Sequence, residues 1–140
     1  MTKDTSLDSG YSEDELAGKS AARGLERDES TFLISSSKVE GTPVYSTDQE
    51  RIGHIDHLMI GKRSGVVEYA VMSFGGFLGM GEKYYPLPWE ALEYNTDTGG
   101  YVVNVDKDQL RDAPSYDLDA NPDFDQQYGQ TVFSYYGFIY

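Results

Sequence analysis

The sequence predicts a mainly β protein: a small antiparallel β-barrel of about six short strands, with short helical turns between them. Three observations lead to this fold class. Short apolar segments recur roughly every 8–12 residues through the middle of the chain. β-Branched and aromatic residues are concentrated in these segments, and Gly, Pro, Asn and Asp separate them. Closure into a barrel is expected because it removes the exposed edges of a small sheet.

Six strands and two helical turns can be placed along the chain. Residues 66–74 are almost continuously apolar, which predicts a strand covered on both faces. Residues 61–65 begin and end with glycine, as a hairpin loop needs. The six expected strands cover residues 42–45, 51–60, 66–74, 83–85, 92–94 and 101–105. Helical turns are expected at residues 89–92 and 106–110, the second with Asp106 as its N-cap.

The composition divides the chain into three parts. Residues 1–30 are polar and acidic and contain few large apolar side chains, which predicts a disordered tail. Residues 31–115 hold the expected barrel. Residues 116–140 form an aromatic, acidic extension.

The charge of the chain excludes several classes of partner. Eleven basic and 24 acidic side chains give a formal net charge of −13 and a pI near 4.3. Phosphates of nucleic acids and anionic lipid headgroups would both be repelled, whereas a basic protein would be attracted. The chain has no Cys, no apolar leader and no apolar run of membrane-spanning length. We therefore expect a cytoplasmic protein without direct nucleic-acid binding or membrane insertion.

No pattern in the sequence indicates catalysis, a cofactor or a metal site. The glycine-rich residues 75–81 match no phosphate-binding motif and predict a tight corner instead. His54 and His57 are three residues apart on the strand expected at residues 51–60, which places them on opposite faces and disfavours a paired metal site. A nucleophile paired with a base is not recognisable, and we expect the protein not to be an enzyme.

The C-terminal extension is the most unusual segment. Residues 124–140 hold seven aromatic side chains, and the apolar residues at positions 124, 128, 132, 135 and 136 have helical spacing. Asn121 followed by Pro122 suits a helix start. A free tail with so many aromatic side chains would expose a large apolar patch, so we expect it to pack either on its own barrel or on another chain.

The middle of the chain resembles the PRC-barrel family. The resemblance covers about 80 residues and is most specific in the order Gly75-Gly76-Phe77-Leu78-Gly79, then Pro86-Leu87-Pro88-Trp89. Members include the cytoplasmic domain of the photosynthetic reaction-centre H subunit, the C-terminal domain of the ribosome-maturation protein and stand-alone bacterial proteins. The resemblance is closest to the last group. The sequence has neither the membrane anchor of the first nor the separate N-terminal domain of the second, so the resemblance does not imply the specific function of either.

The resemblance implies a PRC-type barrel that works as a docking module for a protein partner, or for a second copy in a homodimer. The alternatives are a ribosome-associated RNA-processing role and a role near a photosynthetic or other membrane complex. The candidate contact residues are the exposed or anchoring apolar side chains of the glycine-rich corner, the Pro-Trp turn and the tail: Phe77, Leu78, Trp89, Phe133, Tyr135, Tyr136 and Phe138.

Overall fold

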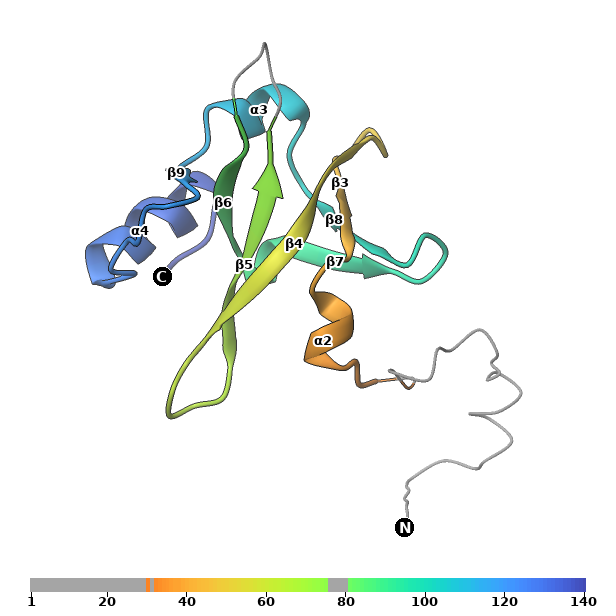
Figure 1. Cartoon of the computed structure of the whole chain (residues 1–140), viewed down its shortest axis with the longest axis horizontal. Helices are drawn as coiled ribbons and strands as arrows, with labels where there is room; N and C mark the ends of the chain where they lie inside the picture. Colours follow the sequence, from red (N-terminus) through yellow and green to blue (C-terminus); the bar gives the residue numbers. More distant parts are fainter. Residues whose placement is uncertain (1–29, 31, 76–80) are drawn as a thin grey trace. The chain divides into compact units, whose positions relative to one another are not determined.

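The structure is a computed structural model that describes residues 30, 32–75 and 81–140 (Figure 1). It contains two compact units, Met1–Val39 and Glu40–Tyr140. In the first unit, the described helix is α2 (Ser36–Val39). The tail expected at residues 1–30 falls outside the described residues except for Ser30, and so do Phe77 and Leu78 of the glycine-rich corner.

The second unit is built on one seven-stranded sheet with the strand order β7-β8-β3-β4-β5-β6-β9 (Figure 1). Neighbouring strands are antiparallel except β3 and β8, which are parallel. All six expected strands are present. The strands are β3 (Pro43–Tyr45), β4 (Arg51–Ile60), β5 (Val67–Phe74), β6 (Lys83–Pro88), β7 (Leu92–Asn95), β8 (Gly100–Val103) and β9 (Tyr116–Asp117).

The sheet is not closed, so the prediction of a closed barrel is wrong in this respect. Within the described residues, β7 and β9 are the two edges and do not pair with each other. β9, which the sequence did not reveal, pairs only with Lys83 and Tyr84 at the start of β6. The next part of β6 contains Pro86 and Pro88, which have no N–H to donate to a further strand.

The expected helical turns are present as η2 (Trp89–Ala91) and α3 (Lys107–Arg111). α3 begins with the predicted cap: Asp106 Oδ1 accepts from the Gln109 backbone N–H at 2.8 Å. The Gln109 side chain in return accepts from the Asp106 N–H at 2.9 Å. This reciprocal pair satisfies two amide donors of the first turn.

The C-terminal extension forms the helix α4 (Gln126–Tyr135), as its spacing predicts, but the helix starts later than expected. Phe124 has a φ of 54°, which is incompatible with a right-handed helix running on from Pro122. Asp125 is the actual N-cap and accepts from the Tyr128 N–H at 2.9 Å. The predicted start at Asn121 and Pro122 is therefore wrong.

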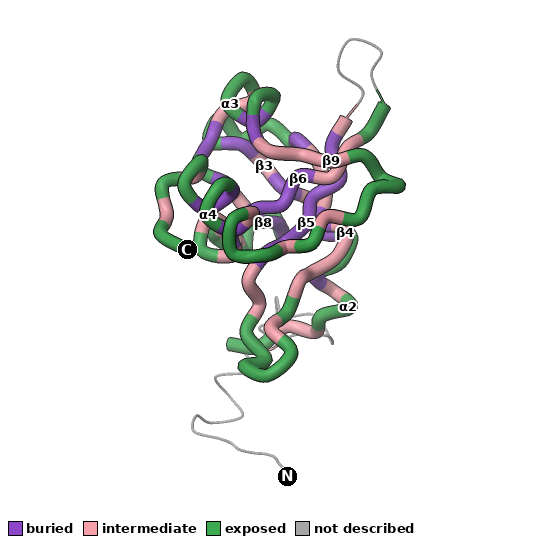
Figure 2. Tube along the Cα trace, turned by 90° about the vertical axis from the view of Figure 1, so that its left-hand side faces the viewer, coloured by how far each residue is buried: buried purple, intermediate pink, exposed green. Residues whose placement is uncertain are grey.

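Strand β5 is covered on both faces, as predicted (Figure 2). On one face Met72 is paired with Ile55 across the sheet, and both side chains are fully buried. On the other face Tyr69 is buried against residues of α4. The apolar core therefore has two layers, one on each side of β5.

An irregularity in β4 changes the placement of the two histidines. His54 pairs with Ser73 and His57 with Val71, because the register shifts between Ile55 and His57. Ser73 and Val71 are two residues apart and share a face, so the histidines also share a face. The prediction that they lie on opposite faces is wrong. Among the described residues, no three His, Asp or Glu side chains gather as metal ligands would.

Candidate docking surface

The C-terminal extension packs on its own sheet. Val132 and Phe133 of α4 form a buried cluster with Tyr69 of β5, in which Val132 is fully buried and Phe133 is 7% exposed. The side chains packed around this cluster are Met59, Phe124, Tyr128, Tyr136 and Phe138. Of the two expected docking modes, the structure shows the one on the same chain.

Edge-to-face ring contacts hold this layer together. The Tyr69 ring lies 5.1 Å from that of Phe124 and 5.5 Å from that of Phe133, both near perpendicular. Such pairs add to the stabilisation that burial of the rings supplies. Burial also raises the pKa of the Tyr69 phenol, with a smaller contribution from the neighbouring Tyr140, and it raises the pKa of Tyr116 to about 12.

The last residues turn back over α4 because of a glycine cap. Gly137 has a φ of 87°, and its N–H donates to the Ser134 carbonyl at 3.0 Å. The Phe138 N–H donates to the Phe133 carbonyl at 2.8 Å, which completes a Schellman motif. The chain therefore reverses direction at Gly137.

Tyr140 then rests on α4 itself. Its ring lies 4.8 Å from that of Phe133, edge to face. A Cβ atom at Gly129 would come within 2.4 Å of the Tyr140 ring, so the missing side chain at Gly129 makes room for it. The Tyr140 hydroxyl donates to Glu68 Oε1 at 3.4 Å. The end of the chain is thus held against both α4 and β5.

Two grooves border this segment, and Glu90 of η2 lines both. The first, which we call the tail groove, has a volume of about 450 Å³. Its lining combines three aromatic rings with two carboxylates: Trp89, Phe133, Tyr140, Glu68 and Glu90, with Val66, Val67, Gln126 and Ile139 beside them.

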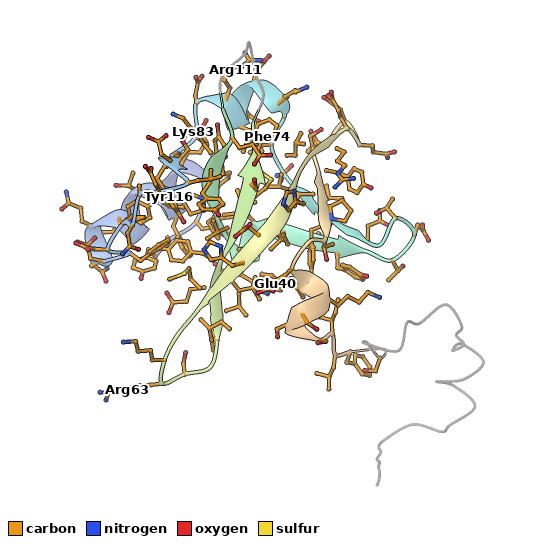
Figure 3. The ribbon with its side chains drawn as sticks, in the orientation of Figure 1. Glu40, Arg63, Phe74, Lys83, Arg111 and Tyr116 are labelled. Carbon is orange, nitrogen blue, oxygen red and sulfur yellow. The ribbon has the colours of Figure 1, made fainter. Side chains whose placement is uncertain are left out.

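The second groove, the β7 groove, has a volume of about 480 Å³. Its lining includes the carboxylates of Glu90 and Glu93 and the rings of Tyr136 and Phe138. None of the residues that line either groove is Lys or Arg. In Figure 3, Arg63 lies at the tip of the β4–β5 hairpin and Arg111 on α3, at opposite ends of the view.

The structure places the contact residues predicted from the sequence in different environments. Trp89 is half-buried, lies 5.5 Å from the Tyr101 ring and lines the tail groove. Phe133 belongs to the core, and it also reaches the wall of the tail groove. Tyr135 is 40% exposed, and its hydroxyl donates to the Gln109 carbonyl, which ties α4 to α3. Tyr136 and Phe138 line the β7 groove.

Sequence reasoning missed several residues of this surface. Glu68 and Glu90 are far apart in the chain, and no local pattern predicts that both line one groove. Ile139 is 95% exposed and Tyr140 packs on Gly129. The available signal was the pair Gly129 and Gly137, which allow close packing and chain reversal.

A second polar arrangement lies at the bulge of β4. His57 Nδ1 and Asp56 Oδ2 are 2.7 Å apart, and the His57 ring lies 5.5 Å from that of Tyr84, edge to face. Both side chains are about one-third exposed. The carboxylate orients the imidazole against the Tyr84 ring, and this geometry fits a role in holding the bulge.

The chain was compared with family models, curated proteins and solved structures. The family model of the PRC-barrel domain matches residues 33–110. A solved structure from Pseudomonas aeruginosa, assigned as the 16S ribosomal RNA processing protein RimM, is 22% identical, with a TM-score of 0.35. The match covers 60% of this chain and 50% of that one, so it spans half the length of RimM. Comparison with curated proteins gave no match. None of the helices in the described part combines the length and apolar character needed to cross a bilayer.

Proposed function

The chain belongs to the PRC-barrel domain family, and on this basis we propose that it is a non-catalytic docking module. Its docking surface is formed by the tail groove, the β7 groove and Glu90 between them. The partner is a protein that presents basic and apolar side chains. The observation that carries this proposal is that aromatic rings and carboxylates line both grooves without any basic residue.

The composition of the surface supports protein binding. Aromatic side chains are enriched in protein interfaces, and Trp is prominent among residues that dominate binding energy. Ile139 is almost fully exposed beside the tail groove, where a partner could cover it. Carboxylates around such a patch favour a basic partner and speed its encounter with a chain of net charge −13.

The surface is also held in place before any partner arrives. α4 is fixed by the buried cluster around Tyr69 and by the Tyr135 hydroxyl on Gln109. The Schellman motif at Gly137 fixes the direction of the last residues. Preorganisation of this kind lowers the ordering cost of binding.

Two surface substitutions test the proposal without touching the core. We expect Ile139→Ser and Glu90→Gln to weaken capture of the native partner by the tagged full chain, because both residues line the grooves and are exposed. The matched control is Leu118→Ser, which alters a 47% exposed apolar residue that lines neither groove. If both groove variants capture the partner as well as the control does, the docking surface lies elsewhere.

The same experiment separates the other possible partners. A ribosome-associated role would run through basic proteins, since the acidic surface repels RNA, and it predicts co-sedimentation with ribosomal subunits. Association with a photosynthetic or other membrane complex predicts recovery in the membrane fraction at low salt. Self-association predicts that Ile139→Ser lowers the mass measured by sedimentation equilibrium. Recovery of the chain as a free cytoplasmic protein with none of these partners would count against docking.

A further inference from the structure

We propose that the tail groove is a site for an organic cation: the guanidinium or ammonium group of an Arg or Lys side chain. This inference rests on the proposed docking function and deepens it, because it names the group that the partner inserts. It goes beyond general charge attraction, because it assigns that group to one groove and to named rings and carboxylates.

The aromatic walls are the first reason. Trp89, Phe133 and Tyr140 all line the groove, and Phe133 meets Tyr140 edge to face at 4.8 Å. The face of an aromatic ring carries negative charge density and attracts cations, with Trp the strongest of the three ring types. The planes of Phe133 and Tyr140 are inclined to each other by 62°, so the two rings present surfaces in two directions, as a cage for a cation requires.

The carboxylates are the second reason. Glu68 and Glu90 line the same groove as the rings. In the described part of the chain neither of them forms an ion pair with Lys, Arg or His. The Tyr140 hydroxyl donates to one oxygen of Glu68, which holds this carboxylate beside the ring. A cation entering the groove would therefore meet two negative groups and no competing positive one.

The shape of the groove is the third reason. Its volume of about 450 Å³ exceeds that of one guanidinium group and leaves space for the attached alkyl stem. Val66, Val67 and Ile139 line the groove as well. The methylene groups of an Arg or Lys side chain would pack on these apolar residues while the charged end reaches the carboxylates. A small inorganic cation would leave this apolar surface unused.

The β7 groove is the natural comparison. It shares Glu90 and has a second carboxylate at Glu93, but neither Trp89 nor Phe133 lines it. If negative charge alone decided binding, the two grooves would be equivalent. The β7 groove has two rings of its own, Tyr136 and Phe138, but only the tail groove has a Trp, the ring type that attracts cations most strongly. Trp89 therefore predicts a preference for the tail groove.

The experiment uses the full chain and a pair of short peptides that differ only in charge. One alternates Gly with Arg, and the other replaces each Arg by citrulline, its uncharged isostere. Trp89 is the single tryptophan, so its indole N–H resonance in ¹H–¹⁵N spectra is an unambiguous reporter. We expect the Arg peptide to shift this resonance and to bind about five- to thirtyfold more tightly than the citrulline peptide.

Variants assign the effect to the groove. We expect Glu68→Gln and Glu90→Gln each to weaken binding of the Arg peptide about two- to fivefold, the range for a partly exposed charge pair. Glu93→Gln removes an equal charge from the neighbouring groove, which has no Trp, and we expect it to weaken binding less than about twofold. Glu90 and Glu93 are exposed and Glu68 is half-buried, and unaltered spectra without peptide verify that the three variants fold.

The possible failures are distinguishable. Equal binding of the citrulline peptide, or an equal loss in Glu93→Gln, overturns the cation site. So does an Arg peptide that leaves the Trp89 resonance in place. None of these results affects the docking proposal, which is instead refuted when Ile139→Ser and Glu90→Gln capture the native partner normally.

Discussion

Val132→Ala tests whether α4 is an integral part of the folded unit. Val132 is fully buried between α4 and the sheet, in the cluster with Tyr69 and Phe133. Removing its two methyl groups costs about 1.6 kcal/mol at about 0.8 kcal/mol per buried group. A residual cavity on the order of 50 Å³ adds about 1 kcal/mol. The higher helix propensity of Ala offsets about 0.5 kcal/mol. We therefore expect a loss of about 2 kcal/mol in the free energy of unfolding.

Urea denaturation followed by Trp89 fluorescence measures this loss. Trp89 lies in η2, outside α4, so its signal reports unfolding of the sheet and not of the helix alone. With a typical slope of 1–3 kcal/mol per M, the midpoint should fall by about 1 M. Ser134→Ala on the same helix is the control, because this residue is exposed and its change should stay within about 0.5 kcal/mol. A Trp89 transition that is unchanged in Val132→Ala would show that the sheet does not depend on α4.

Three further predictions concern individual contacts. Gly129→Ala should displace the Tyr140 ring from α4, since the new Cβ would lie 2.4 Å from that ring. Loss of the nuclear Overhauser effects between Tyr140 and Phe133 would report this displacement, and retained effects would show that the ring adapts in place. Raising the pH from about 9 to about 11 should lower the urea midpoint, because the pKa of Tyr116 is near 10 in the unfolded chain and about 12 in the folded one. The unfolded state therefore binds fewer protons than the folded state in this pH range, and stability falls as the pH rises. Tyr116→Phe should reduce this pH dependence, and an equal slope in that variant would refute the assignment. Gly53→Ala should destabilise the fold by about 1–3 kcal/mol, because its Cβ would lie 2.4 Å from the Ser73 carbonyl oxygen. Gly81→Ala, where a Cβ would meet open space, is the control and should keep the melting temperature of the unsubstituted chain. Equal melting temperatures for the two variants would contradict this account.

Local signals in the sequence predicted the elements well. The nearly continuous apolar run in β5 indicated burial on both faces, and Asp106 marked the start of α3. Each of these predictions depends on residues close together in the chain, where periodicity and capping follow directly from backbone geometry.

The errors have a common physical origin in contacts between distant residues. The bulge before His57 is decided by how β4 matches β5, and nothing within β4 marks it. The late start of α4 reflects the left-handed backbone at Phe124, whose ring is held by Tyr69. The prediction of a closed barrel was wrong for a similar reason, because closure depends on which strand pairs with the outer edge of β6.

The candidate surface was predictable only in part. The aromatic tail and Trp89 stood out in the sequence, and the structure places Trp89 beside the tail in one groove. The carboxylates of Glu68 and Glu90 did not stand out, because single acidic residues are common on any acidic chain. Only the fold brings them together with the rings.

The most direct test of an acidic, aromatic docking surface is the salt dependence of binding at Trp89. The Arg peptide should quench or shift Trp89 fluorescence at low ionic strength. At about 1 M salt, where the Debye length is about 3 Å, its affinity should fall several-fold while some binding by the rings persists. Affinity that is the same at both ionic strengths would contradict the assigned role of Glu68 and Glu90, and no response of Trp89 at low salt would contradict the surface itself.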